Sequence, residues 1–353
     1  RAMGEATPAA MWIDGDQAGL ARDVARAAGL SVVAAGGAGS GTLIAETLGA
    51  GRALTDLRAA LADAGAGLDV RCVVVLARSG LGDADIAALT SAASRRVVVA
   101  SLEPTPGRLE ELTSGSWLGR GAGARAIDTC RSLARLRRGP AMRHARDLLE
   151  AFGALRCVWV RCVGAGASGS LGARVVDGLD VLQDLRGARG GVYGVAAGGG
   201  GRGGAEGLGA LEGEMCITLS HASGAVGCVQ ASGRAGTWRR EVELVGEGGT
   251  LRLEDGSFRW MGPDGAVRDE WRSGQRRGVE AGEVAEDLFS VVDQDPAVEA
   301  LAESLRRMLD PHVAPEPPGE PEGVLATAHA AVLSARTRSA ESAETIRRLL
   351  RRE

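Results

Sequence analysis

The sequence predicts an α/β protein whose first part is a doubly wound parallel sheet and whose second part is an α+β unit with an open sheet. Apolar runs rich in β-branched residues alternate with helical patterns up to residue 104, as in parallel sheets buried on both faces. Residues 214–271 instead alternate apolar and polar side chains in period two, with glycine-containing turn signals between the runs. The two patterns together predict a Rossmann-type sheet followed by a mainly antiparallel sheet flanked by helices.

The N-terminal part is organised around residues 70–104. Val70–Ala77 is a β-branched apolar run, Asp83–Ser94 has helical spacing, and Arg96–Ser101 is a second apolar run. Two buried strands joined by a helix form a right-handed βαβ unit, and ligands bind beyond the carboxyl ends of such strands. The elements expected before it are strands at Ala9–Ile13 and Leu30–Ala35, and helices at Leu20–Ala28, Thr42–Leu48 and Leu54–Ala64.

The second part begins with a largely helical segment over residues 107–150. We expect a Rossmann-type domain at 1–120, an α+β domain at 121–338 and a polar tail at 339–353. The elements expected in the second part are a strand at Arg156–Val163, the strands within Glu214–Trp271, and helices at His144–Phe152, Leu171–Leu185, Pro296–Leu309 and Val324–Arg336.

Composition excludes several classes of protein. The net charge is −4 with both signs interspersed, so nothing indicates binding to nucleic acid or to an anionic membrane. No apolar run approaches the roughly 20 residues that span a bilayer, and we expect a cytoplasmic protein. All 41 basic residues are arginine. Because arginine does not deprotonate, chemistry that needs a side-chain amine of adjustable pKa is excluded.

Five segments, in order, resemble the Gfo/Idh/MocA family of glucose–fructose oxidoreductase-like and inositol-dehydrogenase-like proteins. They include the RRGP segment that begins at Arg137, and VELVGEGGTLRL at Val242–Leu253. The resemblance implies a two-domain fold, NAD or NADP as cofactor, and oxidation or reduction of CH–OH groups of a sugar or polyol. The matching segments are Leu54–Ala77, Arg137–Leu155, Gly169–Asp180, Val242–Leu253 and Val324–Thr337.

The family's dinucleotide motifs are altered in this chain. Aligned with the G-x-G-x-x-G fingerprint, the three glycines fall on Asp14, Asp16 and Gly19, with Gly15 offset by one. A carboxylate about 5 Å from a phosphate charge costs roughly 3 kcal/mol at an effective dielectric near 20, more than a helix dipole returns. Asp16 is alternatively a helix N-cap.

The second strand ends in Ala35, Gly36 and Gly37, so it lacks the acidic residue that binds the adenosine ribose. The candidate cofactor-binding residues, by family position, are Gly15, Gly19, Arg78 and Ser79, and Arg78 is alternatively a surface residue.

The catalytic positions are substituted as well. By resemblance, Glu103 occupies the lysine of the family's E-K-P turn, and Asp177 and Asp180 occupy the histidine and the second aspartate of its H-x-x-D helix. Glu103 is a candidate general base or a turn carboxylate before Pro104. Asp177 and Asp180 are a candidate carboxylate pair, or they lie on a face that is solvated or paired with arginine, since Arg174 is three residues before Asp177. No two histidines have metal-ligand spacing, and no metal site is expected.

Three hypotheses follow. The first is a Gfo/Idh/MocA-like fold without hydride transfer, in a binding, regulatory or scaffold role. The second is an atypical NAD(P)-dependent oxidoreductase of a sugar or polyol that uses Glu103, Asp177 and Asp180. The third is a sugar-binding partner subunit of an active relative, and a homo-oligomer formed through the open face of the second sheet is a further expectation.

Overall fold

The first of the two sheets is parallel throughout and has six strands in the order β3-β2-β1-β4-β5-β6. A computed structural model describes residues 6–65, 67–118, 126–133, 135–186, 192–198, 207–221, 225–273, 295–313 and 321–351. The strands of this sheet are β1 (Thr7–Trp12), β2 (Leu30–Gly36), β3 (Arg52–Leu54), β4 (Cys72–Val75), β5 (Val98–Ser101) and β6 (Cys130–Ser132). The order confirms the predicted doubly wound fold.

Both faces of this sheet are buried, which is why its strands read as continuous apolar runs. Along β4, Val73 and Val75 pack into one core while Cys72 and Val74 pack into the other. Strand β6 begins after residue 120, so the first sheet takes its last strand from the segment that the sequence assigns to the second domain. The helices of this part are α1 (Ala18–Ala28), α2 (Gly41–Leu48), α3 (Leu57–Asp63), α4 (Ile86–Ser94), α5 (Leu109–Thr113) and α6 (Ala126–Thr129).

The second sheet has eight strands in the order β14-β13-β12-β11-β7-β10-β9-β8. Only β7 and β10 pair in parallel, so the predicted, mainly antiparallel sheet is confirmed. Its strands are β7 (Leu155–Val163), β8 (Val192–Gly198), β9 (Glu214–His221), β10 (Val226–Ser232), β11 (Arg239–Gly246), β12 (Gly249–Glu254), β13 (Ser257–Met261) and β14 (Val267–Arg272).

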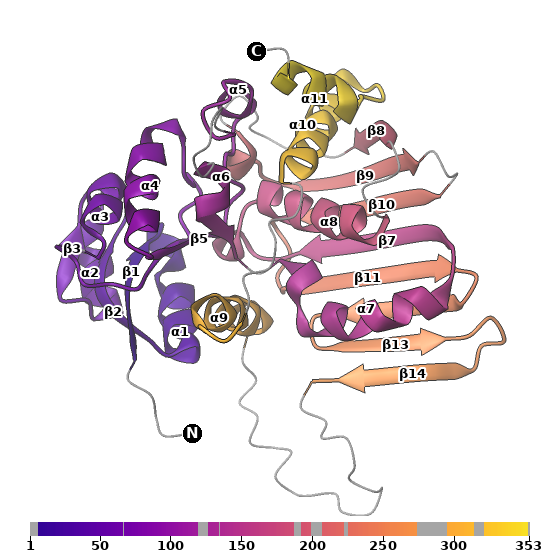
Figure 1. Ribbon diagram of the computed structural model, residues 1–353, viewed down its shortest axis with the longest axis horizontal. Coiled ribbons are helices and arrows are strands. Elements are labelled where there is room, and N and C mark those ends of the chain that lie inside the picture. The colour runs from indigo at the N-terminus through magenta and orange to yellow at the C-terminus, as the bar shows by residue number, and fades with distance from the viewer. Residues whose placement is uncertain are drawn as a thin grey trace, which may run out of the picture.

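Helices α7 (Pro140–Phe152), α8 (Leu171–Arg186) and α10 (Pro321–Thr337) cover one face of this sheet (Figure 1). Helix α8 lies against β7 and β10, and α10 packs on α8 and β8. On the opposite face, Cys216, Thr218 and Ser220 of β9 are exposed. The sheet therefore has one covered face and one open face.

Two further helices connect the parts. Helix α9 (Pro296–Leu309) packs against α1 and lies between the two sheets (Figure 1). Helix α11 (Ala343–Arg351) packs on α10 and buries Ala343 and Ile346, so the segment expected as a polar tail contains a packed helix. No helix in the described part of the chain has the length and apolar character needed to cross a membrane.

Candidate functional site

The carboxyl ends of β1, β4 and β5 meet at one edge of the first sheet, where the predicted site residues gather. The turn after β1 contains the 3-10 helix η1 (Gly15–Gln17), and the turn after β4 contains Arg78. From the second sheet, the 3-10 helix η4 (Gly166–Ser168) and the start of α8 approach the same edge. Parallel strands end at the same edge, which brings these turns together.

Arg78 is bound to the two aspartates of the first turn. Asp14 Oδ2 accepts hydrogen bonds from the Arg78 backbone N–H (3.0 Å) and from its Nε (3.1 Å), and Arg78 Nη2 pairs with Asp16. The interpretation of Asp16 as a helix N-cap is wrong, because η1 moves the start of α1 and Gln17 is its N-cap residue. Two carboxylates and one guanidinium thus share the turn.

Gln17 is the residue of this turn that sequence reasoning missed. Its side chain is completely buried, and its Oε1 accepts a hydrogen bond from the Asp14 N–H (2.9 Å). Its Nε2 donates to the carbonyls of Leu76 (2.9 Å) and Ala167 (3.1 Å). Ala167 belongs to η4, so one side chain joins β1, β4 and the second part of the chain. No local pattern could have revealed it, since Ala167 is 150 residues away.

The glycines near this turn differ in whether a side chain would fit in their place. A Cβ atom on Gly36 would lie 2.1 Å from the Leu54 carbonyl oxygen, and one on Gly37 would lie 2.0 Å from that of Ile13. The end of β2 therefore has no room for a side chain at either residue. Gly19 is exposed, and a Cβ atom there would meet no other atom within 4 Å. The one glycine that matches the fingerprint is therefore not required by close packing against neighbouring protein atoms. Ser79 is also exposed.

Glu103 ties the end of β5 to the start of α8. Its Oε1 accepts a hydrogen bond from the Ser170 N–H (2.9 Å), and its Oε2 accepts one from the Ser170 hydroxyl. Burial raises the pKa of Glu103 to about 7, while the Ser170 hydrogen bonds and the charges of Arg174 and Arg78 oppose that rise. The Glu103 carboxylate therefore accepts hydrogen bonds at the start of α8, 67 residues further along the chain, and not within the turn before Pro104.

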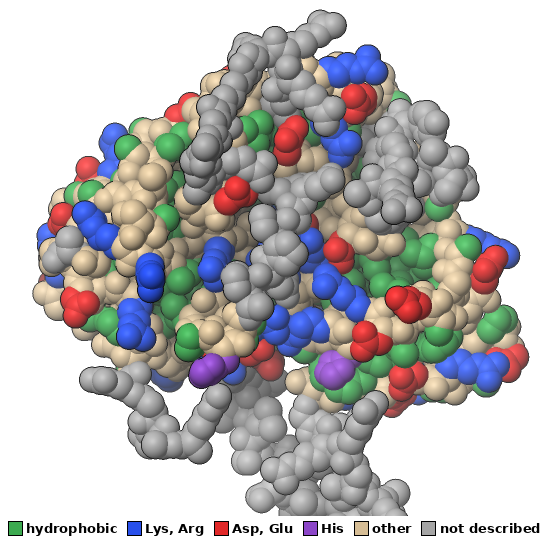
Figure 2. All heavy atoms as spheres, viewed as in Figure 1, with side chains coloured by type: hydrophobic (Ala, Val, Ile, Leu, Met, Phe, Trp, Pro, Cys, Tyr) green, Lys and Arg blue, Asp and Glu red, His purple; other side chains and the backbone are tan. Residues whose placement is uncertain are grey.

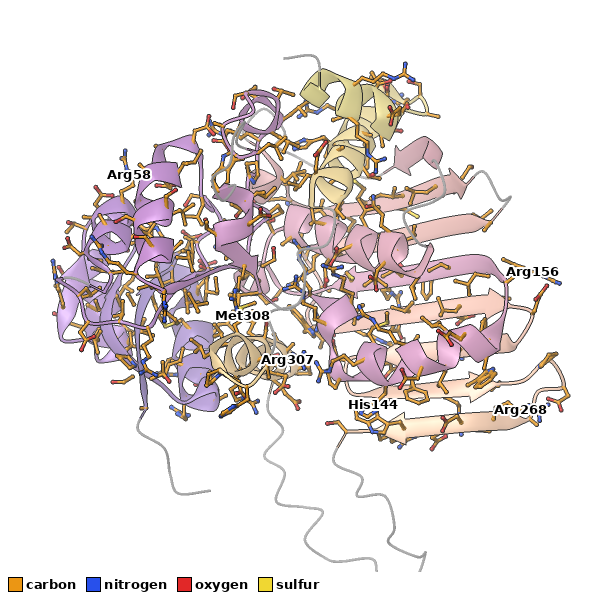
Figure 3. The ribbon with its side chains drawn as sticks, in the orientation of Figure 1. Arg58, His144, Arg156, Arg268, Arg307 and Met308 are labelled. Carbon is orange, nitrogen blue, oxygen red and sulfur yellow. The ribbon has the colours of Figure 1, made fainter. Side chains whose placement is uncertain are left out.

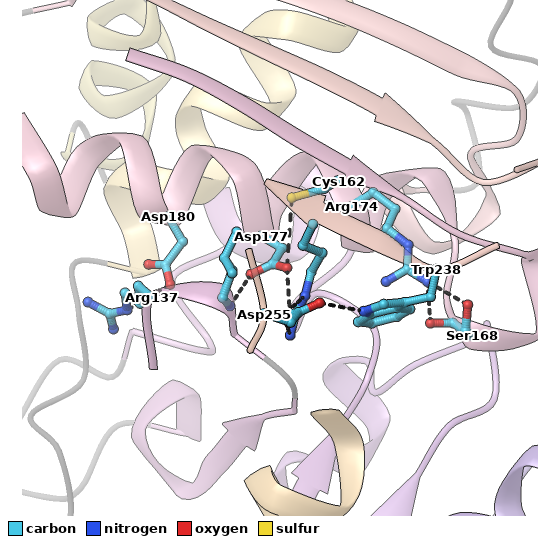
Figure 4. A network of polar contacts seen from close by, with 10 residues as sticks. Arg137, Cys162, Ser168, Arg174, Asp177, Asp180, Trp238 and Asp255 are labelled. Carbon is cyan, nitrogen blue, oxygen red and sulfur yellow. Dashed lines mark hydrogen bonds and ion pairs between the residues drawn. The ribbon is translucent and has the colours of Figure 1, made fainter. Parts of the chain in front are cut away.

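Asp177 and Asp180 are buried and each has its own arginine (Figure 4). Asp177 accepts from the Leu136 N–H (2.7 Å) and from Arg240 Nη1 (3.2 Å). The Oδ2 atom of Asp180 lies 2.7 Å from Arg137 Nε. The alternative of an arginine-paired face is therefore right in kind, although the partners are Arg240 and Arg137 rather than Arg174, and the alternative of a solvated face is wrong. Helix α8 is enclosed between the sheet, α10 and the 3-10 helix η3 (Leu136–Arg138). Burial raises the pKa of Asp180, and Arg135 and Arg137 oppose that rise.

Arg174 lies over Trp238 instead. Its guanidinium carbon is 4.1 Å from the centre of the indole ring, and that of Arg240 is 4.7 Å from the same ring. Arg174 Nη2 donates to the carbonyl oxygen of Ser168 (2.6 Å) and to its hydroxyl (2.8 Å). Burial, followed by the charge of Arg240, lowers the pKa of Arg174 to about 10. Trp238 donates to Asp255, which completes a buried network of polar side chains (Figure 4).

A cavity of about 560 Å³ lies beside this network, lined by parts of β6, η3, α8 and α9. Seven arginines and five carboxylate residues line it. Arginine side chains also lie across the middle of the molecule's face, between the two sheets (Figure 2). Of the site residues predicted from sequence, Asp180 is the one that contributes to the cavity lining described by the structure. Within the described part of the chain, no group of three or more His, Cys, Asp or Glu side chains is placed to hold a metal ion.

No family model matches the chain, and no curated protein matches it by sequence. Solved structures do resemble it over nearly its whole length. An oxidoreductase from Agrobacterium radiobacter, solved with NAD+, L-tartaric acid and magnesium, is 15% identical with a TM-score of 0.61, covering 97% of this chain and 99% of its own. For a myo-inositol dehydrogenase from Corynebacterium glutamicum the identity is 16% and the TM-score 0.57, with coverage of 95% and 98%. An oxidoreductase from Pseudomonas syringae has 14% identity and a TM-score of 0.63, with coverage of 96% and 99%.

At identities this low the similarity establishes the fold alone, and it extends over 98–99% of each of these structures. The chain therefore has the fold of these oxidoreductases and of the myo-inositol dehydrogenase, as the sequence resemblance predicts.

Proposed function

We propose that this chain is a Gfo/Idh/MocA-type protein that binds a small molecule and does not carry out dinucleotide-dependent hydride transfer. The observation that carries the proposal is the turn between β1 and α1, where the backbone N–H groups of Asp14 and Arg78 already donate to Gln17 Oε1 and to Asp14 Oδ2.

The residues of the turn do not fit a dinucleotide. A phosphate at a helix N-terminus needs free backbone N–H groups and a favourable charge. Here the Asp14 N–H is bonded to Gln17, and Asp14, Asp16 and Arg78 together carry a net negative charge. A phosphate would have to displace Arg78 and then meet two carboxylates, each costing roughly 3 kcal/mol at about 5 Å.

Proton transfer at the family positions is unsupported for a related reason. Asp177 is engaged by Arg240 and by the Leu136 N–H, and Asp180 is engaged by Arg137. Both carboxylates therefore already have partners within the protein, and neither is left free to take a proton from a substrate. The chain also contains no lysine that could replace the missing one.

Calorimetric titration with NAD and NADP tests the proposal. We expect no saturable binding of either dinucleotide below about 1 mM, because the pyrophosphate position is filled by the protein's own groups. The Agrobacterium radiobacter oxidoreductase, which was solved with NAD+, is the positive control under the same conditions. Micromolar binding of NAD or NADP to this chain would overturn the proposal.

One observation favours a second candidate, an atypical NAD(P)-dependent oxidoreductase. Burial raises the pKa of Glu103 to about 7, and a carboxyl with that pKa exchanges protons efficiently at neutral pH. Under this alternative, Glu103 would take the proton of a substrate hydroxyl. The test is turnover of a sugar or polyol. Activity that disappears in Glu103→Gln but persists in Glu150→Gln, a change at an exposed position of α7, would establish this alternative.

A further inference from the structure

The cavity beside η3 is separate from the first turn and has a different character. Its volume of about 560 Å³ falls within the range of sites for small organic ligands. Ile127, Val176 and Leu325 supply apolar wall, while Thr105 and Ser132 supply hydroxyl groups. A mixed lining of this kind suits a ligand with both a carbon frame and polar groups.

The charged lining is unbalanced in favour of arginine. The arginines are Arg131, Arg135, Arg137, Arg138, Arg240, Arg306 and Arg307, and the carboxylate residues are Asp128, Asp180, Asp255, Glu299 and Glu303. Arg137 pairs with Asp180, and Arg240 pairs with Asp255. The excess positive charge lies along β6 and η3 and on α9, where Figure 3 places Arg307 and Met308 near the middle of the molecule.

Arg131 and Arg135 contact neutral groups. Arg131 Nη1 donates to the Met308 carbonyl (3.3 Å), and Arg135 Nη2 donates to the Ser132 hydroxyl (3.1 Å). Both residues are half-buried, and neither is within ion-pair distance of a carboxylate among the residues that the structure describes. A guanidinium has five N–H donors in a planar fork that matches a carboxylate or a phosphate. Each of these side chains therefore keeps donors for a ligand.

We propose that this cavity binds a small organic anion whose carboxylate or phosphate group is held by Arg131 and Arg135. A neutral polyol would bring no negative charge to the two half-buried guanidinium groups, whereas an anion would accept charge-assisted hydrogen bonds from both. This inference names the ligand class of the proposed binding role. It does not depend on the loss of the dinucleotide site.

Thermal-shift and calorimetric titrations test it, with inorganic phosphate, citrate and neutral myo-inositol at constant ionic strength. We expect saturable binding of phosphate or citrate and none of myo-inositol. Arg131→Gln and Arg135→Gln should each weaken anion binding by about tenfold or more, because each removes a charge-assisted hydrogen bond. Arg58→Gln on α3, which Figure 3 places at the outer left of the molecule, away from Arg307 and Met308, should bind as the wild type does.

The phosphate and citrate arms distinguish the two anionic groups. Binding of neither anion, or equal affinity in wild type, Arg131→Gln and Arg135→Gln, would overturn the inference. If a variant does not fold, hydrogen exchange on the wild type decides: the anion should protect residues 130–138, and protection elsewhere alone would count against the site. Dinucleotide binding together with retained anion binding would defeat the proposed loss of hydride transfer and leave this inference standing.

Discussion

Four side chains, those of Asp14, Asp16, Gln17 and Arg78, determine the character of the first turn through hydrogen bonds and ion pairs. Gln17 satisfies the Asp14 N–H, and Arg78 neutralises part of the charge of Asp14 and Asp16. A buried polar group without such partners would cost about 1–3 kcal/mol. The turn is therefore stable as an internally bonded unit.

Glu103 makes a pH-dependent contribution to stability. Burial raises its pKa from 4.5 to about 7, so the protonated form is favoured in the folded state. Its stabilising contribution is complete below the unfolded pKa and is lost as the pH rises through about 7, an effect on the order of 3 kcal/mol. Glu103→Gln resembles the protonated form. We expect it to match the wild type near pH 4 and to exceed it in free energy of unfolding near pH 8.

Urea denaturation of both proteins at several pH values measures this difference. Glu150→Gln, an exposed change on α7, should follow the wild-type curve throughout. If the free energies of unfolding of wild type and Glu103→Gln differ by the same amount from pH 4 to pH 8, the raised pKa of Glu103 is contradicted.

At the scale of single elements, α9 is the helix that closes the gap between the sheets. Its Val298, Leu301 and Leu305 are buried at helical spacing, and the helix packs against α1. Asp295 caps its first turn by accepting from the Ala297 N–H (2.9 Å), and a proline follows the cap. These local signals explain why its bounds agree with those predicted from sequence.

Leu305→Ala should lower the free energy of unfolding by about 2–5 kcal/mol, because it leaves a cavity beneath a completely buried side chain. Chemical denaturation measures the loss. Arg306→Ala on the exposed side of α9 removes a surface ion pair with Glu303 and should cost less than about 1 kcal/mol. If Leu305→Ala lowers the free energy of unfolding no more than Arg306→Ala does, the buried face of α9 does not stabilise the fold.

At the scale of the whole molecule, the open face of the eight-stranded sheet is the surface on which we expect a second copy to bind. Helices cover the other face, while this face exposes Val226 of β10 to 43%. Light scattering should give a mass of a dimer or larger. Val226→Arg should lower that mass by placing a charge on the face, and Leu43→Arg on exposed α2 should not. A monomeric wild type at tens of micromolar would contradict the expectation.

The sequence by itself determined the fold class and most of the elements. Val70–Ala77 predicted β4 because a strand buried on both faces must be continuously apolar. Leu171–Leu185 and Pro296–Leu309 predicted α8 and α9 from helical spacing. The short strands β3 and β6 escaped prediction, since three residues carry too little periodicity and their pairing partners lie elsewhere in the chain.

Only the tertiary structure decided what the polar residues do. Asp177 and Asp180 are three residues apart on one helix, yet they meet Arg240 and Arg137 rather than Arg174 or solvent. Gln17 reaches Ala167, and Glu103 reaches Ser170, across 150 and 67 residues of chain. Apolar burial follows a short-range pattern that a sequence displays directly. The partner of a buried charge depends on which distant segments are packed together, and that is a property of the folded chain alone.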